Sequence, residues 1–140
     1  MRAYFRSRRL LPLCLLAVCL APVPSFAARD ARLVEAVQRQ DLAAVRGLLK
    51  TPGVDVNAPM GDGATALHWA AHRNALDILD VLLAAGAKPG VANDFGVTPL
   101  SLASVNGSAS AIERLVKAGA SVNQALPSGE TPLMTAARVG

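Results

Sequence analysis

Residues 63–71 read Gly-Ala-Thr-Ala-Leu-His-Trp-Ala-Ala, and the phrase returns as Gly-Val-Thr-Pro-Leu-Ser-Leu-Ala-Ser at residues 96–104. A third copy, Gly-Glu-Thr-Pro-Leu-Met-Thr-Ala-Ala, occupies residues 129–137, so that successive copies begin 33 residues apart. A second phrase keeps the same period, since Leu-Leu-Ala-Ala-Gly-Ala at residues 82–87 recurs as Leu-Val-Lys-Ala-Gly-Ala at residues 115–120. Self-similarity at a fixed period of this length predicts a chain of stacked structural repeats.

The residues within one period predict a pair of helices. Thr98 can cap a helix N-terminus, and Pro99 suits the first helical position because no N–H donor is needed there. Gly107 suits a tight turn with positive φ, and the apolar residues that follow it stand at helical spacing: Ala111, Ile112, Leu115 and Val116. Gly119, like Gly86 one period earlier, is placed to end the second helix in the left-handed conformation.

This pattern resembles the ankyrin repeat, whose signature is Thr-Pro-Leu-His-x-Ala at a period of 33 residues. The resemblance implies an all-α solenoid of helix-turn-helix pairs joined by β-hairpin loops. It covers residues 28–140, divided into a degenerate repeat at 29–62, full repeats at 63–95 and 96–128, and a half repeat at 129–140. Ala66, Ser101 and Met134 replace the signature proline or histidine, which is common variation and leaves the fold prediction intact.

The repeat region is predicted to begin with a capping repeat and to continue beyond its C-terminal end. In the degenerate repeat, Leu33, Ala36 and Val37 align with residues 67, 70 and 71, and its polar substitutions suit a solvent-facing cap. Gly140 falls in the interhelical-turn slot that Gly107 occupies one period earlier, so the sequence ends halfway through a repeat. We therefore expect the chain to be an N-terminal fragment of a longer protein that continues into a closing repeat.

Residues 1–27 have the layout of a secretory signal peptide. Four arginines precede an apolar run at residues 10–21, two prolines follow, and Ser25 and Ala27 supply the small residues of a cleavage site after Ala27. The run is too short to span a bilayer, which needs about 20 residues. Three alternatives stay open: a retained membrane anchor, twin-arginine export through Arg8-Arg9, and lipidation at Cys19.

The net charge and the cysteine content of the chain both change once residues 1–27 are removed. The net charge of +4 resides in the four arginines of residues 1–27, and from Ala28 onward ten basic residues balance ten acidic ones. The basic character is therefore no evidence for a nucleic-acid partner. Both cysteines, Cys14 and Cys19, would leave with the signal, which excludes disulfides and cysteine metal sites from the mature chain.

Few residues suggest a catalytic or metal-binding role. His68 and His72 stand i, i+4 and could share a metal ion, but Trp69 replaces the glutamate of a zincin motif and no third ligand is apparent. His68 also fills the histidine slot of the repeat signature, where the resemblance implies structural hydrogen bonds. We therefore expect no metal and no cofactor, and we expect Trp69 to belong to the core.

The resemblance implies that a partner protein is contacted by the hairpin tips and by the exposed face of the inner helices. In this sequence those positions are Met60, Asp62, Asn93, Asp94 and Leu126 at the tips, and His72, Arg73, Val105, Asn106 and Arg138 on the helices. Met60 and Leu126 are expected to be exposed apolar residues, which either mark an interface or reflect loop drift without a partner.

We expect a non-catalytic protein-binding or scaffold module that is exported, to the bacterial periplasm or to the outside of the cell. Its partner would be another protein, with no nucleic acid and no membrane contact after signal cleavage. A different class of function stays open, in which the repeats are the targeting arm of an enzyme whose catalytic domain lies beyond residue 140. A membrane-tethered scaffold is the third possibility and requires an uncleaved signal.

Overall fold

The computed structural model describes residues 26–139, with side chains from Ala31 onward. Residues 1–25, which hold most of the predicted signal segment at 1–27, and Gly140 lie outside this range. Seven helices and no strand occur in the described part of the chain. They are α1 (Phe26–Gln38), α2 (Leu42–Leu49), α3 (Ala66–His72), α4 (Leu76–Ala84), α5 (Pro99–Val105), α6 (Ala109–Lys117) and α7 (Pro132–Val139). The predicted cleavage point after Ala27 lies in the first turn of α1.

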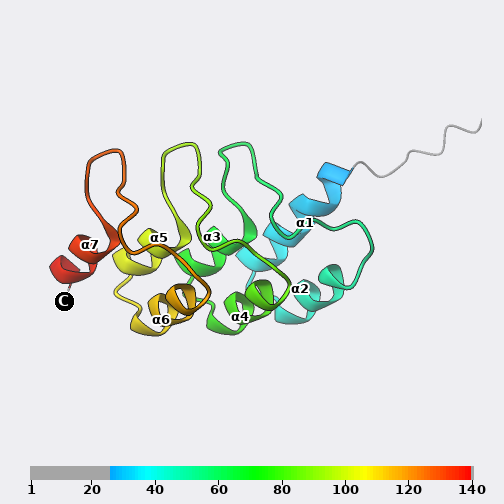
Figure 1. The fold of residues 1–140 in the computed structure, drawn as a ribbon. Helices are drawn as coiled ribbons and strands as arrows, with labels where there is room; N and C mark the ends of the chain where they lie inside the picture. Colours follow the sequence, from blue (N-terminus) through cyan, green and yellow to red (C-terminus); the bar gives the residue numbers. More distant parts are fainter. Residues whose placement is uncertain (1–25, 140) are drawn as a thin grey trace, which may run out of the picture.

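The helices form two rows, as predicted for a repeat solenoid. The inner helices α1, α3, α5 and α7 lie side by side, and the outer helices α2, α4 and α6 pack beneath them (Figure 1). A long loop links each outer helix to the next inner helix, and these loops project to one side of the row (Figure 1). The all-α solenoid is confirmed, although the projecting loops contain no assigned strand.

Positive φ angles occur where the sequence predicts helix-ending turns. The interhelical turns have φ of 52° at Asn74 and 64° at Gly107, and Gln40 has 57° in the same slot of the degenerate repeat. Gly86 and Gly119 follow the ends of α4 and α6 with φ of 90° and 99°. Glycine adopts these angles without the Cβ clash of other residues, which explains how the chain reverses within a few residues.

Side chains cap the starts of α2, α5 and α6, whereas the start of α4 has no side-chain cap. Thr98 Oγ1 accepts from Ser101 N at 3.1 Å while Thr98 N donates to Ser101 Oγ at 2.9 Å, which closes a reciprocal capping box before α5. Asp41 and Ser108 cap the outer helices α2 and α6 through side-chain oxygens. Ala75 holds that position before α4 and has no side-chain acceptor, so this helix lacks the hydrogen bond that the other two have.

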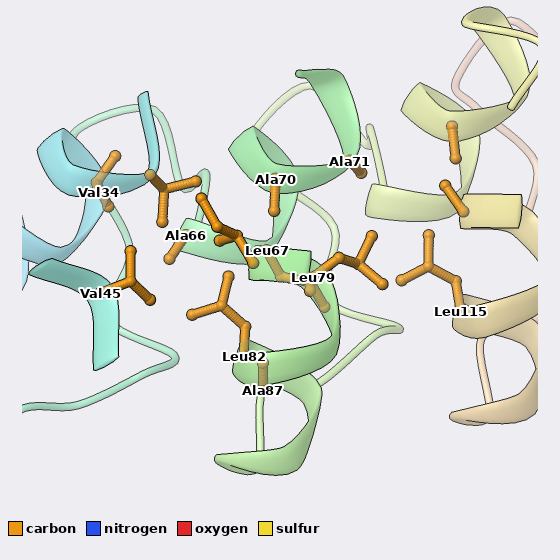
Figure 2. Packing of buried hydrophobic residues seen from close by; sticks show 14 of the residues in the cluster. Val34, Val45, Ala66, Leu67, Ala70, Ala71, Leu79, Leu82, Ala87 and Leu115 are labelled. Carbon is orange, nitrogen blue, oxygen red and sulfur yellow. The ribbon is translucent and has the colours of Figure 1, made fainter. Parts of the chain in front are cut away.

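The core is a continuous apolar layer between the two rows. Leu67 from α3, Leu79 and Leu82 from α4, and Leu115 from α6 are all fully buried in this layer, together with small side chains such as Ala70 (Figure 2). Burying a leucine contributes about 1.5–3 kcal/mol, and alanines let the thin helix pairs approach closely. The apolar spacing of α6 groups Val116 with the buried residues, but Val116 is 40% exposed on the outer side of this helix.

The degenerate repeat packs as a cap. Leu33, Ala36 and Val37 are buried against the neighbouring repeat, which confirms their alignment with Leu67, Ala70 and Ala71. The opposite side of α1 carries the exposed ion pair between Glu35 and Arg39, whose charged atoms are 3.5 Å apart. At the other end, α7 packs on α5 and leaves Leu133 and Met134 67% and 59% exposed. The expected continuation beyond Gly140 stays a prediction.

Candidate functional site

Three projecting loops, which we call the finger loops, share one closing geometry. Each has a four-residue turn at its tip, at residues 60–63, 93–96 and 126–129. In the first loop Met60 N donates to Ala64 O at 2.8 Å, and Gly63 N donates to Met60 O at 2.9 Å. The same two hydrogen bonds recur one and two periods later, so Met60, Asn93 and Leu126 occupy equivalent positions. The loops are therefore fixed by a few backbone bonds rather than by a strand ladder.

His68 connects the first finger loop to the second. Its Nδ1 lies 3.1 Å from Thr65 N and 3.0 Å from Thr65 Oγ1, and its Nε2 lies 3.0 Å from Val97 O in the next repeat. Burial lowers the pKa of the His68 imidazole, an effect that the hydrogen bond to Val97 O only partly offsets. With both ring nitrogens engaged, His68 is structural, as the repeat signature implies, and not a metal ligand. The described residues contain no cluster of three metal-ligating side chains.

A pocket of about 240 Å³ opens between the first two finger loops and the helices α3 and α5. Its walls are Asp62, Ala64, His68, Trp69, His72, Asn93, Val97 and Leu102. Trp69 is partly exposed here, so the expectation of a core tryptophan holds only in part. Trp69 and His72 meet edge to face, with ring centroids 6.0 Å apart and planes at 85°.

The predicted partner-contact residues divide into exposed and partly buried groups. Exposed side chains are Met60, Asp62, His72, Arg73, Asp94, Val105, Asn106 and Arg138. Asn93 and Leu126 are partly buried. The expectation that Leu126 is exposed like Met60 therefore holds only in part. The third finger loop leans on the second, since a Cβ added to Gly96 would meet Pro127 Cδ at 2.7 Å.

Two of these residues have structural bonds that the sequence did not indicate. Asn106 Nδ2 donates to Ala71 O at 3.1 Å and to His72 O at 2.8 Å, which ties α5 to the end of α3. Asn93 Oδ1 accepts from the backbone N–H groups of Phe95 and Val97, which shapes the second turn. Whether either residue also contacts a partner stays a prediction.

Phe95 is a candidate contact that the sequence analysis missed. It lies at the tip of the second finger loop and is 68% exposed. The equivalent tip positions are Asp62 and Ser128, both polar. Aromatic residues make up only 4% of this chain, so a phenylalanine in a polar turn between Asp94 and Gly96 was a usable signal.

We call the surface formed by the finger loops and the exposed side of the inner helices the groove. No helix among the described residues is long and apolar enough to cross a membrane. The exposed side chains of the groove, among them His72, Arg73 and Val105, are available for surface contact.

Comparison with known proteins identifies the repeats. The family model for ankyrin repeats (3 copies) matches residues 33–125 and, in a second alignment, 73–140. Among curated proteins, the chain is 39% identical to the palmitoyltransferase Hip14 of Drosophila melanogaster over 89 residues, and 40% identical to the human mitochondrial disaggregase over 94 residues. It is also 39% identical to the human 2-5A-dependent ribonuclease over 77 residues.

These similarities are confined to a segment of each relative. The alignments cover 62%, 64% and 54% of this chain, but only 14%, 13% and 10% of the three relatives' own lengths. The shared part is therefore the repeat array, and the activities that name those proteins belong to them as wholes.

Proposed function

This chain belongs to the ankyrin-repeat family, and from that premise we propose that it is a protein-binding or scaffold module acting outside the cytoplasm. Ankyrin repeats are generally protein-interaction modules, and the repeat domain is itself non-catalytic. Stacked repeats present an extended surface that is suited to a protein partner.

The observation that carries the proposal is the apolar character of exposed residues along the groove. Met60, Phe95 and Val105 are 39%, 68% and 56% exposed, although each is a large apolar side chain. On the opposite side, the outer helices expose the charged residues Asp77, Asp80 and Glu113, and Val116 is the one large apolar side chain exposed on them among the described residues. Exposed apolar groups rimmed by polar ones are typical of protein interfaces.

Site-specific photocrosslinking in the native host tests this assignment. A photoreactive amino acid would replace His72 or Val105 in the groove of the full-length protein, and Asp77 or Glu113 on the outer helices as matched controls. We expect discrete protein adducts from the groove positions and none from the outer positions. Adducts only from the outer helices, or none from either set, would contradict a groove interface.

The partner captured in this way allows a quantitative check. Replacing Met60, His72 and Arg73 together with alanine should weaken its binding, because all three side chains are exposed on the groove. Circular dichroism would verify that the triple variant keeps its helical content. Unchanged affinity would place the interface elsewhere.

Export is the second part of the proposal and is supported by the layout of residues 1–27. N-terminal sequencing of the protein from its native host should begin at Ala28. Intact Met1 on membrane-bound material would instead indicate the retained anchor, and a lipid-modified Cys19 would indicate lipidation.

The alternative function, a targeting arm of an enzyme, is favoured by the nature of two relatives. A palmitoyltransferase and a ribonuclease both contain a segment similar to this array. Sequencing the gene past residue 140 distinguishes the two functions, since a downstream non-repeat domain with clustered polar residues would support the enzyme.

A further inference from the structure

The pocket between the first two finger loops combines an apolar wall with one carboxylate, two histidines and Asn93. Ala64, Trp69, Val97 and Leu102 line most of it, and Asp62 is the only carboxylate in its lining. No lysine or arginine lines it, and Arg73 at the end of α3 stands outside it. His68 is buried with both ring nitrogens hydrogen-bonded, and burial lowers its pKa, so it adds no positive charge near neutral pH.

Trp69 offers this pocket carbon surface only. Its indole Nε1 is the one buried side-chain polar atom without a hydrogen-bond partner among the described residues, so the exposed part of the ring is apolar. The edge-to-face contact with His72 holds the ring in place at 6.0 Å between centroids. An aromatic surface of this kind attracts cations through its quadrupole, and tryptophan does so most strongly.

Asp62 lines the pocket together with Trp69, and Asp94 lies next to Asp62 on the adjacent loop tip. Asp62 Oδ1 accepts from Ala64 N at 3.1 Å, and the structure gives its other oxygen no donor among the described residues. Asp94 is joined to Asp62 through the backbone, because Asp94 N donates to Asp62 O at 3.1 Å. Asp94 is exposed, so both acidic groups are accessible from the groove.

We propose that this pocket receives a lysine or arginine side chain from an extended segment of the partner protein. The inference rests on the proposed function and specifies the chemistry of the partner. The aliphatic stem would lie along Trp69, Val97 and Leu102, and the cationic head would reach Asp62 and Asp94 at the rim. Long basic side chains place an apolar stem and a charged head in this way, and charge-assisted hydrogen bonds to carboxylates are strong.

Other occupants fit the pocket less well. An acidic segment would be repelled by Asp62 and Asp94, and no lysine or arginine lines the pocket to compensate for this. A purely apolar side chain would cover the Asp62 carboxylate without giving it a partner, which is unfavourable for a charged group.

Trp69 provides a direct readout, because it is the only tryptophan in the chain. A displayed library of random dodecapeptides would be selected against the folded full chain, and the enriched peptides would be titrated while Trp69 fluorescence is recorded. We expect a shared lysine or arginine whose replacement by norleucine or citrulline lowers affinity at least about tenfold, since a charge-assisted contact and a cation–π contact are both lost. Comparing lysine with arginine at that position distinguishes the two cations.

Variants of the protein identify the residues responsible. Asp62→Asn removes the charge and keeps an oxygen that can accept from Ala64 N, so it should weaken binding of the selected peptides several-fold. Asp77→Asn makes the same charge change on the outer helix α4 and should leave affinity unchanged. Trp69→Leu keeps the pocket apolar and should also weaken binding, as measured by calorimetry.

The outcomes separate this inference from the proposed function. Peptides that tolerate norleucine or citrulline, or selection of acidic or neutral sequences, would overturn the basic-side-chain inference while leaving a groove interface in place. Failure to select any peptide that alters Trp69 fluorescence would also overturn it. The proposed function fails separately, if photocrosslinks form away from the groove.

Discussion

Two successive pairs of repeats in this solenoid share the same sequence motif but are linked by different hydrogen bonds. We call the contact between residues 63–95 and 96–128 the first junction, and that between residues 96–128 and 129–139 the second. At the first junction His68 Nε2 lies 3.0 Å from Val97 O, and the loop tips are joined by Asp94 N donating to Asp62 O. The equivalent bonds do not occur at the second junction within the described residues.

Three substitutions explain this difference. Ser101 takes the place of His68, but its hydroxyl turns back to Thr98 O at 2.8 Å and stays within its own repeat. Pro127 takes the place of Asp94 and has no N–H to donate. Val139 takes the place of Asn106, whose amide bonds Ala71 O and His72 O across the first junction.

The repeat signature fixes how neighbouring repeats pack but not which hydrogen bonds join them. Inner helices pack on one another at both junctions, through buried residues such as Leu67 and Leu100. In a solenoid, stability is approximately a sum of repeat terms and nearest-neighbour interface terms. We therefore expect the first junction to be the stronger of the two.

The largest expected effect on stability comes from removing the His68 side chain, which bridges the two repeats of the first junction. His68→Ala should lower the free energy of unfolding by about 3 kcal/mol, because Thr65 N–H and Val97 C=O both lose partners at about 1–3 kcal/mol each. Ser101→Ala is the matched control and should cost about 1 kcal/mol, since only a local cap is lost. Urea unfolding followed by circular dichroism measures both, and equal losses would show that the His68 bridge does not couple the repeats.

A smaller effect tests a feature that the two full repeats share. Gly86→Val and Gly119→Val should each destabilise by more than about 1 kcal/mol, because a β-branched residue is strained at positive φ. Neither site has an atom within 4 Å of an added Cβ, so the cost arises from the backbone alone and should be similar in both repeats. An unchanged melting temperature in either variant would refute the strain argument.

A stabilising change is expected at α4. Ala75→Ser would supply the side-chain acceptor that Asp41 and Ser108 provide for α2 and α6, and should add about 0.5–1 kcal/mol. Because α4 belongs to the first junction, the change should widen the difference between the junctions. Ser108→Ala is the reverse experiment and should remove a similar amount; a gain from that change would argue against capping as the cause.

The smallest expected effect is a pH dependence confined to the first junction. Burial lowers the pKa of folded His68 below its ordinary value of 6.5, so folding favours the neutral ring. The contribution is fully present above the unfolded pKa and is lost as pH falls through the folded pKa. Stability should therefore decline between pH 7 and pH 5 in the wild-type chain and decline less in His68→Gln. Parallel pH curves for the two proteins would contradict this assignment.

The sequence predicted the elements that recur in every repeat. It did not predict the contacts that occur at one position only. Thr98 as a cap, the turn at Gly107 and the structural role of His68 follow from periodic positions, whose surroundings are the same in every ankyrin pair. The exposure of Phe95 at a loop tip and the hydrogen bonds of Asn106 to the end of α3 each occur in one repeat only, so the periodic pattern does not indicate them. Val116 shows the limit of periodicity, since α6 packs against α5 and α4 and still leaves this residue 40% exposed.

The amide of Asn106 has a consequence for how the protein is produced. Asn106-Gly107-Ser108 is an acceptor sequence for N-linked glycans, which attach to the same side-chain nitrogen that bonds Ala71 O and His72 O. A sugar there would replace one of the two donated hydrogens and place bulk beside His72. Protein from a eukaryotic secretory host could thus lose a tether of the first junction and part of its groove, whereas protein from a bacterial cytoplasm would keep both.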